Sequence, residues 1–439
     1  MNHIKRIFGL VVATLLVTSG WAQMKFSFSG VTATEETLAD GSTLITLPAG
    51  TDLNGFSELG MAATVAGLPV ALDAITPNPS TTFVTDGEIE VFVYDGKAYS
   101  FRFTAGEYFT AIIFSDPHVE QTSYGGLTVA NEQTFVNNIC NLGKEGGRTV
   151  AFAKAPRGYV PTADIVFCLG DMDKDNASES ETKNFTDAMQ GFNDAGIPFV
   201  TLVGNHDIVG DVLDNGQWGL TAGTGGYSTN NVALKVVANQ WTTAAENGDF
   251  EVTTIMDGTS HVQMNPFTFK FKGVRFYCGQ TYWFQKPYSG MFFSGTSDLM
   301  SPTYYAPDGV IEALESFVDE QNKEAKEPSV WMQHYPFNFG GDCDRWWMDQ
   351  NASGVTIDAE YMDTENPTIY TTAKQKKDKL ASIINKTGNP VHFSGHMHSN
   401  GTNTYNGVTD KTIGQPGKAY AVLCKEGVGV VEIIETTFY

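Results

Sequence analysis

The chain of 439 residues has 27 Lys and Arg against 50 Asp and Glu, a net charge of −23, with 41% hydrophobic and 18% charged residues. This balance is typical of a folded protein and excludes an intrinsically disordered chain. The acidic excess argues against a nucleic-acid binder, because affinity for the phosphate backbone rests mainly on Lys and Arg. It still allows a small phosphate ester held through bound cations, since local ions override the global charge.

Residues 1–22 have the features of a secretory signal peptide. Lys5 and Arg6 are positively charged, residues 7–17 form an apolar run, and Gly20 and Ala22 are small. The apolar run is shorter than the ~20 residues of a membrane-spanning helix, which favours a cleaved signal over a membrane anchor. We therefore expect cleavage near Ala22 and an exported protein, whether periplasmic, cell-surface or secreted, without a transmembrane segment.

Residues 23–106 are predicted to form a small all-β unit. Apolar and polar residues alternate between turns rich in Gly, Thr, Asn and Pro. The sequence Tyr94-Asp95-Gly96-Lys97 contains the Asp-Gly signal of a two-residue hairpin turn. Both a separate sandwich and an extension of a larger sheet are compatible with this pattern.

Residues 107–439 are predicted to form one α/β domain, because short apolar strands alternate with helical segments. The expected helices are residues 127–142, 179–195, 307–326 and 372–386. The expected strands are residues 108–115, 164–169, 197–203, 267–272, 274–278, 329–333, 390–394, 420–424 and 429–434.

Five cysteines are present, and an odd number in an exported protein leaves at least one unpaired unless chains cross-link. Cys168, Cys278 and Cys424 lie in apolar, strand-like contexts, so we expect them to be buried as small hydrophobic residues. The sequence contains no Cys-x-x-Cys pair, which argues against a zinc ribbon or a thioredoxin-type site.

Five groups of polar residues directly follow predicted strands. In an extended chain, residues i and i+2 face the same way, so an Asp-x-His or His-x-His sequence can bind one ion with both side chains. The carboxyl ends of parallel strands form the edge at which α/β proteins build their sites. One such group alone is equally compatible with a surface or structural role, but five together predict a metal site. The groups are Asp116-Pro117-His118, Gly170-Asp171, Gly204-Asn205-His206-Asp207, His334 and Gly395-His396-Met397-His398.

This ordered set of motifs resembles the calcineurin-like metallophosphoesterase superfamily over roughly residues 108–400. The resemblance implies a four-layer α/β/β/α sandwich with two metal ions at the sheet edge. It implies that one metal ion is held by Asp116, His118, Asp171 and His398. It further implies that Asp171 bridges to a second metal ion, held also by Asn205, His334 and His396.

The resemblance also implies catalytic roles for His206, near the leaving group, and for Asp207, which would orient His206. Mixed Asp, Asn and His ligands suit Mn, Fe or Zn better than Mg alone. Two divalent or trivalent cations roughly 3.5–4 Å apart can activate a bridging hydroxide that attacks phosphorus directly. A protonated His206 can then give its proton to the leaving alkoxide.

Within this superfamily, the sequence looks more like secreted bacterial-type phosphodiesterases, the sphingomyelinase-like branch included. Gly170-Asp171 is followed by Met-Asp-Lys-Asp-Asn without a tyrosine, which disfavours a tyrosinate–iron site of the purple acid phosphatase kind. We predict an exported phosphoesterase that hydrolyses a small-molecule or lipid phosphate ester, with a diester slightly favoured over a monoester. Nucleic acid is disfavoured, because the acidic surface repels a polyanion.

The alternative is a catalytically inactive carbohydrate- or surface-binding protein that retains the metallophosphoesterase fold. In that case residues 24–105 would be the adhesive part. The presence of every expected ligand type favours the enzyme. The sequence makes no prediction of the oligomeric state.

Overall fold

The computed structural model describes residues 23–54, 56–121, 125–156, 159–172, 179–202, 204, 252–254, 266–279, 291–292, 299–300, 310–337, 378–415 and 417–438. The chain divides into two compact units. The first comprises residues up to Tyr108 together with Ala153–Val160, and the second comprises Phe109–Phe152 and Pro161–Tyr439.

The described part of the first unit is all-β apart from two short 3-10 helices, η1 (Ser57–Leu59) and η2 (Leu72–Ala74). It has two sheets of its own. One sheet has the order β1 (Met24–Phe28), β4 (Met61–Val65), β5 (Leu68–Val70). The other has the order β2 (Thr34–Thr37), β3 (Thr43–Leu47), β7 (Lys97–Ala105), β6 (Ile89–Tyr94).

The predicted hairpin between β6 and β7 is confirmed, with Tyr94 opposite Lys97. Asp95 and Gly96 have φ of 49° and 71°, values that a tight hairpin turn requires and that Asp and Gly tolerate. Four phenylalanine rings pack together in the core of this unit, because these positions of its strands point inward. They are Phe26, Phe92, Phe101 and Phe103, with centroids 4.6–6.2 Å apart.

The second unit is built on two larger sheets. The five-stranded sheet has the order β10 (Phe199–Thr201), β9 (Ile165–Cys168), β8 (Tyr108–Phe114), β20 (Lys418–Lys425), β21 (Gly429–Thr437). The seven-stranded sheet has the order β11 (Thr253–Thr254), β12 (Phe267–Phe271), β13 (Val274–Cys278), β16 (Pro328–Met332), β17 (Gly388–Ser394), β19 (Val408–Thr412), β18 (Gly401–Tyr405). A further two-stranded pair joins β14 (Met291–Phe292) to β15 (Leu299–Met300).

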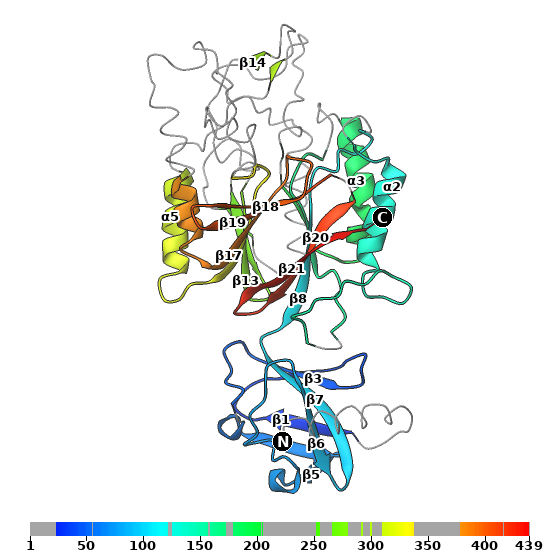
Figure 1. Ribbon diagram of the computed structural model, residues 1–439, viewed down its shortest axis with the longest axis vertical. Coiled ribbons are helices and arrows are strands. Elements are labelled where there is room, and N and C mark those ends of the chain that lie inside the picture. Colours follow the sequence, from blue (N-terminus) through cyan, green and yellow to red (C-terminus); the bar gives the residue numbers. More distant parts are fainter. Residues whose placement is uncertain are drawn as a thin grey trace. The chain divides into compact units, whose positions relative to one another are not determined.

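Helices cover the outer face of each large sheet, so the second unit has four layers in the order α/β/β/α (Figure 1). Helices α2 (Val129–Cys140) and α3 (Glu179–Asp194) lie on the five-stranded sheet. Helix α5 (Val310–Gln321) and the helical residues 378–384 lie on the seven-stranded sheet. The predicted four-layer sandwich is therefore confirmed.

The core between the two sheets is apolar because alternate residues of their strands face each other. In β8, Ala111 and Ile113 belong to this central cluster, together with Phe167 of β9 and Phe276 of β13. The rings of Phe167 and Phe276 stack with centroids 5.1 Å apart. Phe114 is the next residue after Ile113 and faces the other side of the sheet. Its ring packs against Phe135 of α2, with the ring centroids 5.2 Å apart.

The parallel strands fix where the polar motifs meet. In one sheet β8, β9 and β10 are mutually parallel, and in the other β13, β16, β17 and β19 are parallel. Their carboxyl ends therefore meet at one edge of each sheet. The described parts of the elements predicted from the sequence are found within about five residues of their expected bounds. Residue 203, residues 307–309 and residues 372–377 of these expected elements lie outside the described residues.

The hairpin of β18 and β19 was not predicted. Strands β18 and β19 read GTNTY and VTDKT, which are too polar to show the alternation expected of a half-buried strand. The turn between them is Asn406-Gly407, with φ of 45° and 85°. This Asn-Gly pair is the strongest short hairpin signal in a sequence, and it would have identified the two strands.

The predicted burial of three cysteines is confirmed. Cys168, Cys278 and Cys424 each have 0% exposure, and each is a reduced cysteine. Burial raises the pKa of the thiols of Cys278 and Cys424, so both stay protonated at neutral pH. The fifth cysteine, Cys343, lies outside the described residues.

Candidate metal centre

The candidate site lies where strands of both large sheets end. Asp116 and His118 follow β8, and Asp171 follows β9, both in the five-stranded sheet. His334 follows β16, and His396 and His398 follow β17, both in the seven-stranded sheet. The structure thus brings together six of the residues that the sequence singled out as metal ligands. Asn205, His206 and Asp207 lie outside the described residues.

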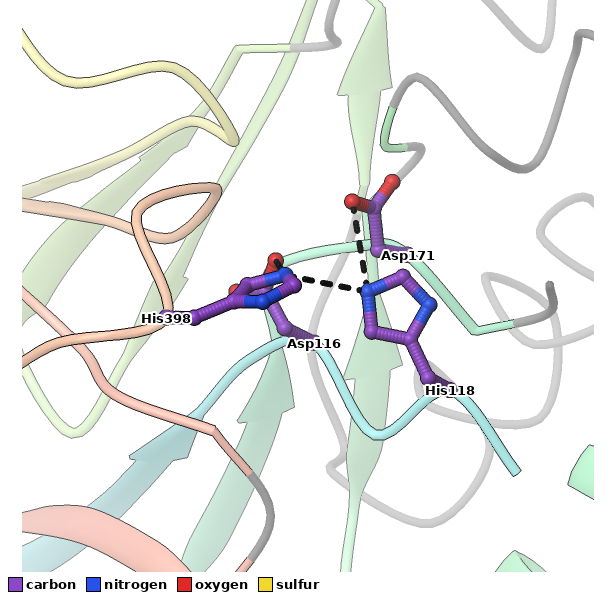
Figure 2. Close-up of side chains that lie close together, drawn as sticks. All are labelled: Asp116, His118, Asp171 and His398. Atoms are coloured by element: carbon purple, nitrogen blue, oxygen red, sulfur yellow. Dashed lines mark hydrogen bonds and ion pairs between the residues drawn. The ribbon is translucent and has the colours of Figure 1, made fainter. Parts of the chain in front are cut away.

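One group of potential ligands is formed by Asp116, His118, Asp171 and His398, whose donor atoms all lie within 4.8 Å of one another. Figure 2 shows the two imidazole rings and the two carboxylates turned toward one another. Nε2 of His118 lies 3.1 Å from Nε2 of His398 and 3.8 Å from Oδ2 of Asp171. Nε2 of His398 lies 3.3 Å from Oδ1 of Asp116.

A second group shares Asp171 with the first and adds His334 and His396, again with donor atoms within 4.8 Å. Nε2 of His334 lies 3.2 Å from Oδ2 of Asp171. A carboxylate has two oxygens, each with its own lone pairs, so one side chain can serve two neighbouring ions. Asp171 is the residue through which the two groups are joined.

The donor atoms are spaced as ligands of a metal ion are. Nitrogen and oxygen ligands lie about 2.0–2.2 Å from Zn²⁺, so neighbouring ligand atoms around one ion are about 3.0–3.6 Å apart. The distances of 3.1, 3.2 and 3.3 Å between donor atoms fall in this range. Carboxylate and imidazole donors also suit divalent transition metals. The described residues therefore fit divalent metal ions.

Asp116 is fully buried, yet its carboxylate stays in the charged form. Burial by itself disfavours the charged carboxylate, but the hydrogen bond with His398 and the nearby imidazoles of His334 and His118 outweigh it. The net effect is that the pKa of Asp116 is lowered. The carboxylate is thus ionised at neutral pH, which is the state that binds a metal ion.

Backbone groups orient His334 and Asp116 through hydrogen bonds to their side chains. Nδ1 of His334 lies 2.9 Å from the carbonyl oxygen of Leu169, which only accepts, so Nδ1 carries the proton and Nε2 presents its lone pair to the site. The backbone N–H of His396 donates to both carboxylate oxygens of Asp116, at 3.1 and 3.0 Å. These bonds join the ends of the two sheets at the site.

A family model for calcineurin-like phosphoesterases matches residues 109–400, about two thirds of the chain. The chain belongs to this family. It is accordingly a metal-dependent phosphoric ester hydrolase, and its family implies a small-molecule phosphate ester as substrate. No curated protein matches the chain.

Solved structures also match the chain. A purple acid phosphatase from yellow lupin seeds matches over 95% of this chain and 72% of its own, with 14% identity and a TM-score of 0.37. The structure of PhoD matches over 92% of this chain and 72% of its own, with 11% identity and a TM-score of 0.39. A putative 5'-nucleotidase from Staphylococcus aureus matches over 76% of this chain and 54% of its own, with 12% identity and a TM-score of 0.36.

The loops that carry the potential ligands have an unusual backbone conformation. Asp116, His118, Asp171, His396 and His398 all have positive φ, between 42° and 69°. Non-glycine residues in this region cost about 1–3 kcal/mol each and cluster at functional sites. The surrounding hydrogen bonds hold them there, for example from the N–H of Asp116 to the carbonyl of Gly170 and from the N–H of His118 to the carbonyl of Asp171.

Two glycines allow the ligand loops to approach one another closely. A Cβ on Gly204 would lie 2.1 Å from Oδ1 of Asp171 and 2.3 Å from its backbone nitrogen. A Cβ on Gly395 would lie 1.9 Å from Oγ of Ser115 and 2.6 Å from Oδ2 of Asp116. A side chain at either position would displace a carboxylate of the candidate centre.

We therefore expect Gly204→Ala to weaken metal binding. The added methyl group must push Asp171 aside, and overpacking of this kind costs typically about 1–3 kcal/mol of stability. Titration of the metal-stripped variant and its thermal unfolding measure the two effects. Gly196→Ala is the matched control, because φ there is 67° but no atom lies within 4 Å of the added Cβ. It should lose stability through its backbone and bind metal normally; equal metal affinity in both variants would contradict the expectation.

A buried carboxylate behind the centre was not identified from the sequence. Asp410, on β19, has 0% exposure and accepts three hydrogen bonds of 2.8 Å. The donors are the backbone N–H of Phe337, Oγ of Ser394 and Nδ1 of His392, a buried histidine inside β17. Phe337 lies three residues after His334, and Ser394 lies two residues before His396. Asp410 thus fixes the ends of both strands that carry ligands of the second group.

We expect Asp410→Asn to destabilise the protein and to lower metal affinity at the second group. The amide turns one acceptor into a donor that faces another donor, which costs about 1–3 kcal/mol for a buried group. Denaturant unfolding and metal titration provide the readouts. Asp319→Asn is the control, because Asp319 pairs with Lys386 at the surface, where such pairs contribute about 0–1 kcal/mol. Equal stability losses in the two variants would show that the buried network has no such role.

Within the described part of the chain, no helix combines the length and the apolar character needed to cross a membrane.

Proposed function

We propose that the chain is an exported, dinuclear phosphoesterase that hydrolyses a phosphate ester by direct attack of an activated water. The observation that carries this proposal is the position of Asp171 in both groups of potential ligands. A buried carboxylate shared by two groups is the arrangement that a pair of neighbouring cations needs.

In this proposal Asp116, His118, Asp171 and His398 hold the first metal ion. The second is held by Asp171, His334, His396 and Asn205. Support for Asn205 comes from its neighbour Gly204, which lies directly against Asp171. The mixture of carboxylate, amide and imidazole ligands favours Mn, Fe or Zn.

When bound, the two cations would supply an activated water nucleophile and neutralise charge on the phosphoryl oxygens. The residues of the chain then have separate tasks. Asp171 keeps the two ligand groups at a fixed separation, and the buried carboxylate of Asp116 balances positive charge. We assign His206 to give a proton to the leaving alkoxide and Asp207 to orient His206. No side chain is needed as a covalent nucleophile.

We propose a small or lipid phosphodiester as the preferred substrate. The charge of −23 disfavours polyanions such as nucleic acids, whose approach the surface would slow. A diester carries one negative charge where a monoester carries up to two, so it suffers less repulsion. Export rests on the predicted signal peptide of residues 1–22.

The test is hydrolysis of bis-p-nitrophenyl phosphate and of p-nitrophenyl phosphate by metal-stripped protein refilled with Mn, Fe, Zn or Mg. We expect turnover only after refilling, and faster turnover of the diester. A faster reaction with the monoester would overturn the diester preference alone. Two bound metal ions without turnover of either ester would instead favour the surface-binding alternative.

A further inference from the structure

Gln415 lies directly behind the ring of His398. Its amide nitrogen Nε2 is 2.7 Å from Nδ1 of His398. The other ring nitrogen, Nε2, faces Asp116 and His118 at 3.3 and 3.1 Å. The two nitrogens of this imidazole therefore have different partners, with Gln415 on one side and the ligand group on the other.

We propose that Gln415 is a positioning residue whose amide, after a half-turn, stabilises the tautomer of His398 that binds the metal ion. This inference rests on the metal centre proposed above. A neutral imidazole carries one proton, so an ion on Nε2 requires the proton to be on Nδ1, where a hydrogen-bond acceptor stabilises it. The amide of Gln415 has an oxygen as well as a nitrogen, and a half-turn of the amide presents the oxygen to Nδ1–H.

The amide suits both states of the site. In the arrangement seen here, Gln415 donates to Nδ1, so the ring proton is on Nε2 and points to Oδ1 of Asp116. When a cation replaces that proton, the ring needs an acceptor at Nδ1, and the same side chain can provide it. An aliphatic residue could serve neither state, and a carboxylate could serve only the second.

The position of Gln415 is fixed by three segments of the chain. The N–H of Ile413 donates to the carbonyl of Ser394, and the N–H of Gly414 donates to Oδ1 of Asn400. On the other side, Gly125 lies so close that a Cβ there would be 2.4 Å from Oε1 of Gln415. The backbone just before Gln415 is therefore fixed, and its amide lies close to both His398 and Gly125.

The test compares Gln415→Leu with Gln415→Glu in the full chain, using competition between the protein and a Zn²⁺ chelator. Leucine is close in size and forms no hydrogen bond, so we expect one of the two Zn²⁺ ions to bind about 10–100-fold more weakly. Glutamate keeps an acceptor oxygen and should bind both ions at least as tightly as the wild type. Gln415→Met repeats the apolar change if the leucine variant does not fold. Gln190→Leu, which removes an exposed hydrogen bond to Asp194, is the matched control.

A nitrogen-15 NMR spectrum of the Zn²⁺-loaded protein labelled at histidine gives a second readout. The Nδ1–H of His398, assigned by its absence from a His398→Ala variant, should be protected from exchange in the wild type and in Gln415→Glu. It should exchange rapidly in Gln415→Leu. Loss of packing alone would not produce this difference between the two variants.

Unchanged Zn²⁺ affinity in Gln415→Leu would overturn the proposal. Equally weak binding by the leucine and glutamate variants would also overturn it, because the side chain would then act through its shape. If the wild type bound no Zn²⁺ at all, the metal centre itself would be wrong. That failure differs from the first two, in which the wild type binds metal normally.

Discussion

Replacing Asp171 by asparagine should weaken metal binding and lower turnover together while leaving the protein folded. Asp171 is buried, and its Oδ2 faces Nε2 of His334 at 3.2 Å and Nε2 of His118 at 3.8 Å. Removing one partner from a buried charge pair costs about 3–5 kcal/mol. This corresponds to a loss of roughly 10²–10⁴-fold in affinity for the metal ions.

The fold should survive this change because asparagine has the same shape and keeps the backbone contacts of residue 171. Its carbonyl still accepts from the N–H of His118 at 3.1 Å. Metal analysis, steady-state kinetics and thermal unfolding of the metal-free protein measure the three expectations. The matched control is Asp164→Asn, which alters a carboxylate at the opposite end of the same strand, β9. Full activity in Asp171→Asn would remove the basis of the proposed centre.

The second large effect is expected for His206→Ala, which should slow hydrolysis without releasing metal. A positioned proton donor contributes typically about 10²–10⁴-fold to the rate. The loss should be greatest for esters with poorly acidic leaving groups, because a good leaving group departs without a proton. Rates for a series of aryl and alkyl esters, measured with the metal content of each sample, provide the check.

His261→Ala is a suitable control for this series, since the sequence assigns no role to His261. It should keep the wild-type rate for every ester. A uniform fall across good and poor leaving groups in His206→Ala would argue against proton donation. Loss of metal from the same variant would instead make His206 part of the binding site.

The sequence predicted the layers of the second unit because each element carries its own local signal. β8 and β9 are continuous apolar runs, as expected of strands covered on both faces. In α2, Thr128 caps the helix by accepting from the N–H of Asn131, and Phe135, Val136 and Ile139 form its buried face. The ligand motifs could be found for the same reason, since each is a short sequence at a strand end.

Features that depend on contacts distant in the sequence were not predictable in this way. Gln415 contacts His398, 17 residues away in the sequence, and Asp410 accepts from the N–H of Phe337, 73 residues away. Nothing near either residue in the sequence marks it as part of the site. The β18–β19 hairpin, which carries Asp410, also lacks the apolar alternation that identifies most strands. Only the folded arrangement of the two sheets shows which polar residues stand behind the ligands.

The most direct test of the account is to count the metal ions bound by the folded chain and to measure phosphodiester hydrolysis on the same samples. Metal-stripped protein should be titrated with Zn²⁺ or Mn²⁺ and followed by elemental analysis after removal of free metal. The account predicts two ions per chain, with no turnover in the metal-free protein and full turnover only when both sites are filled. Hydrolysis by metal-free protein, or a folded chain that binds no metal, would contradict it.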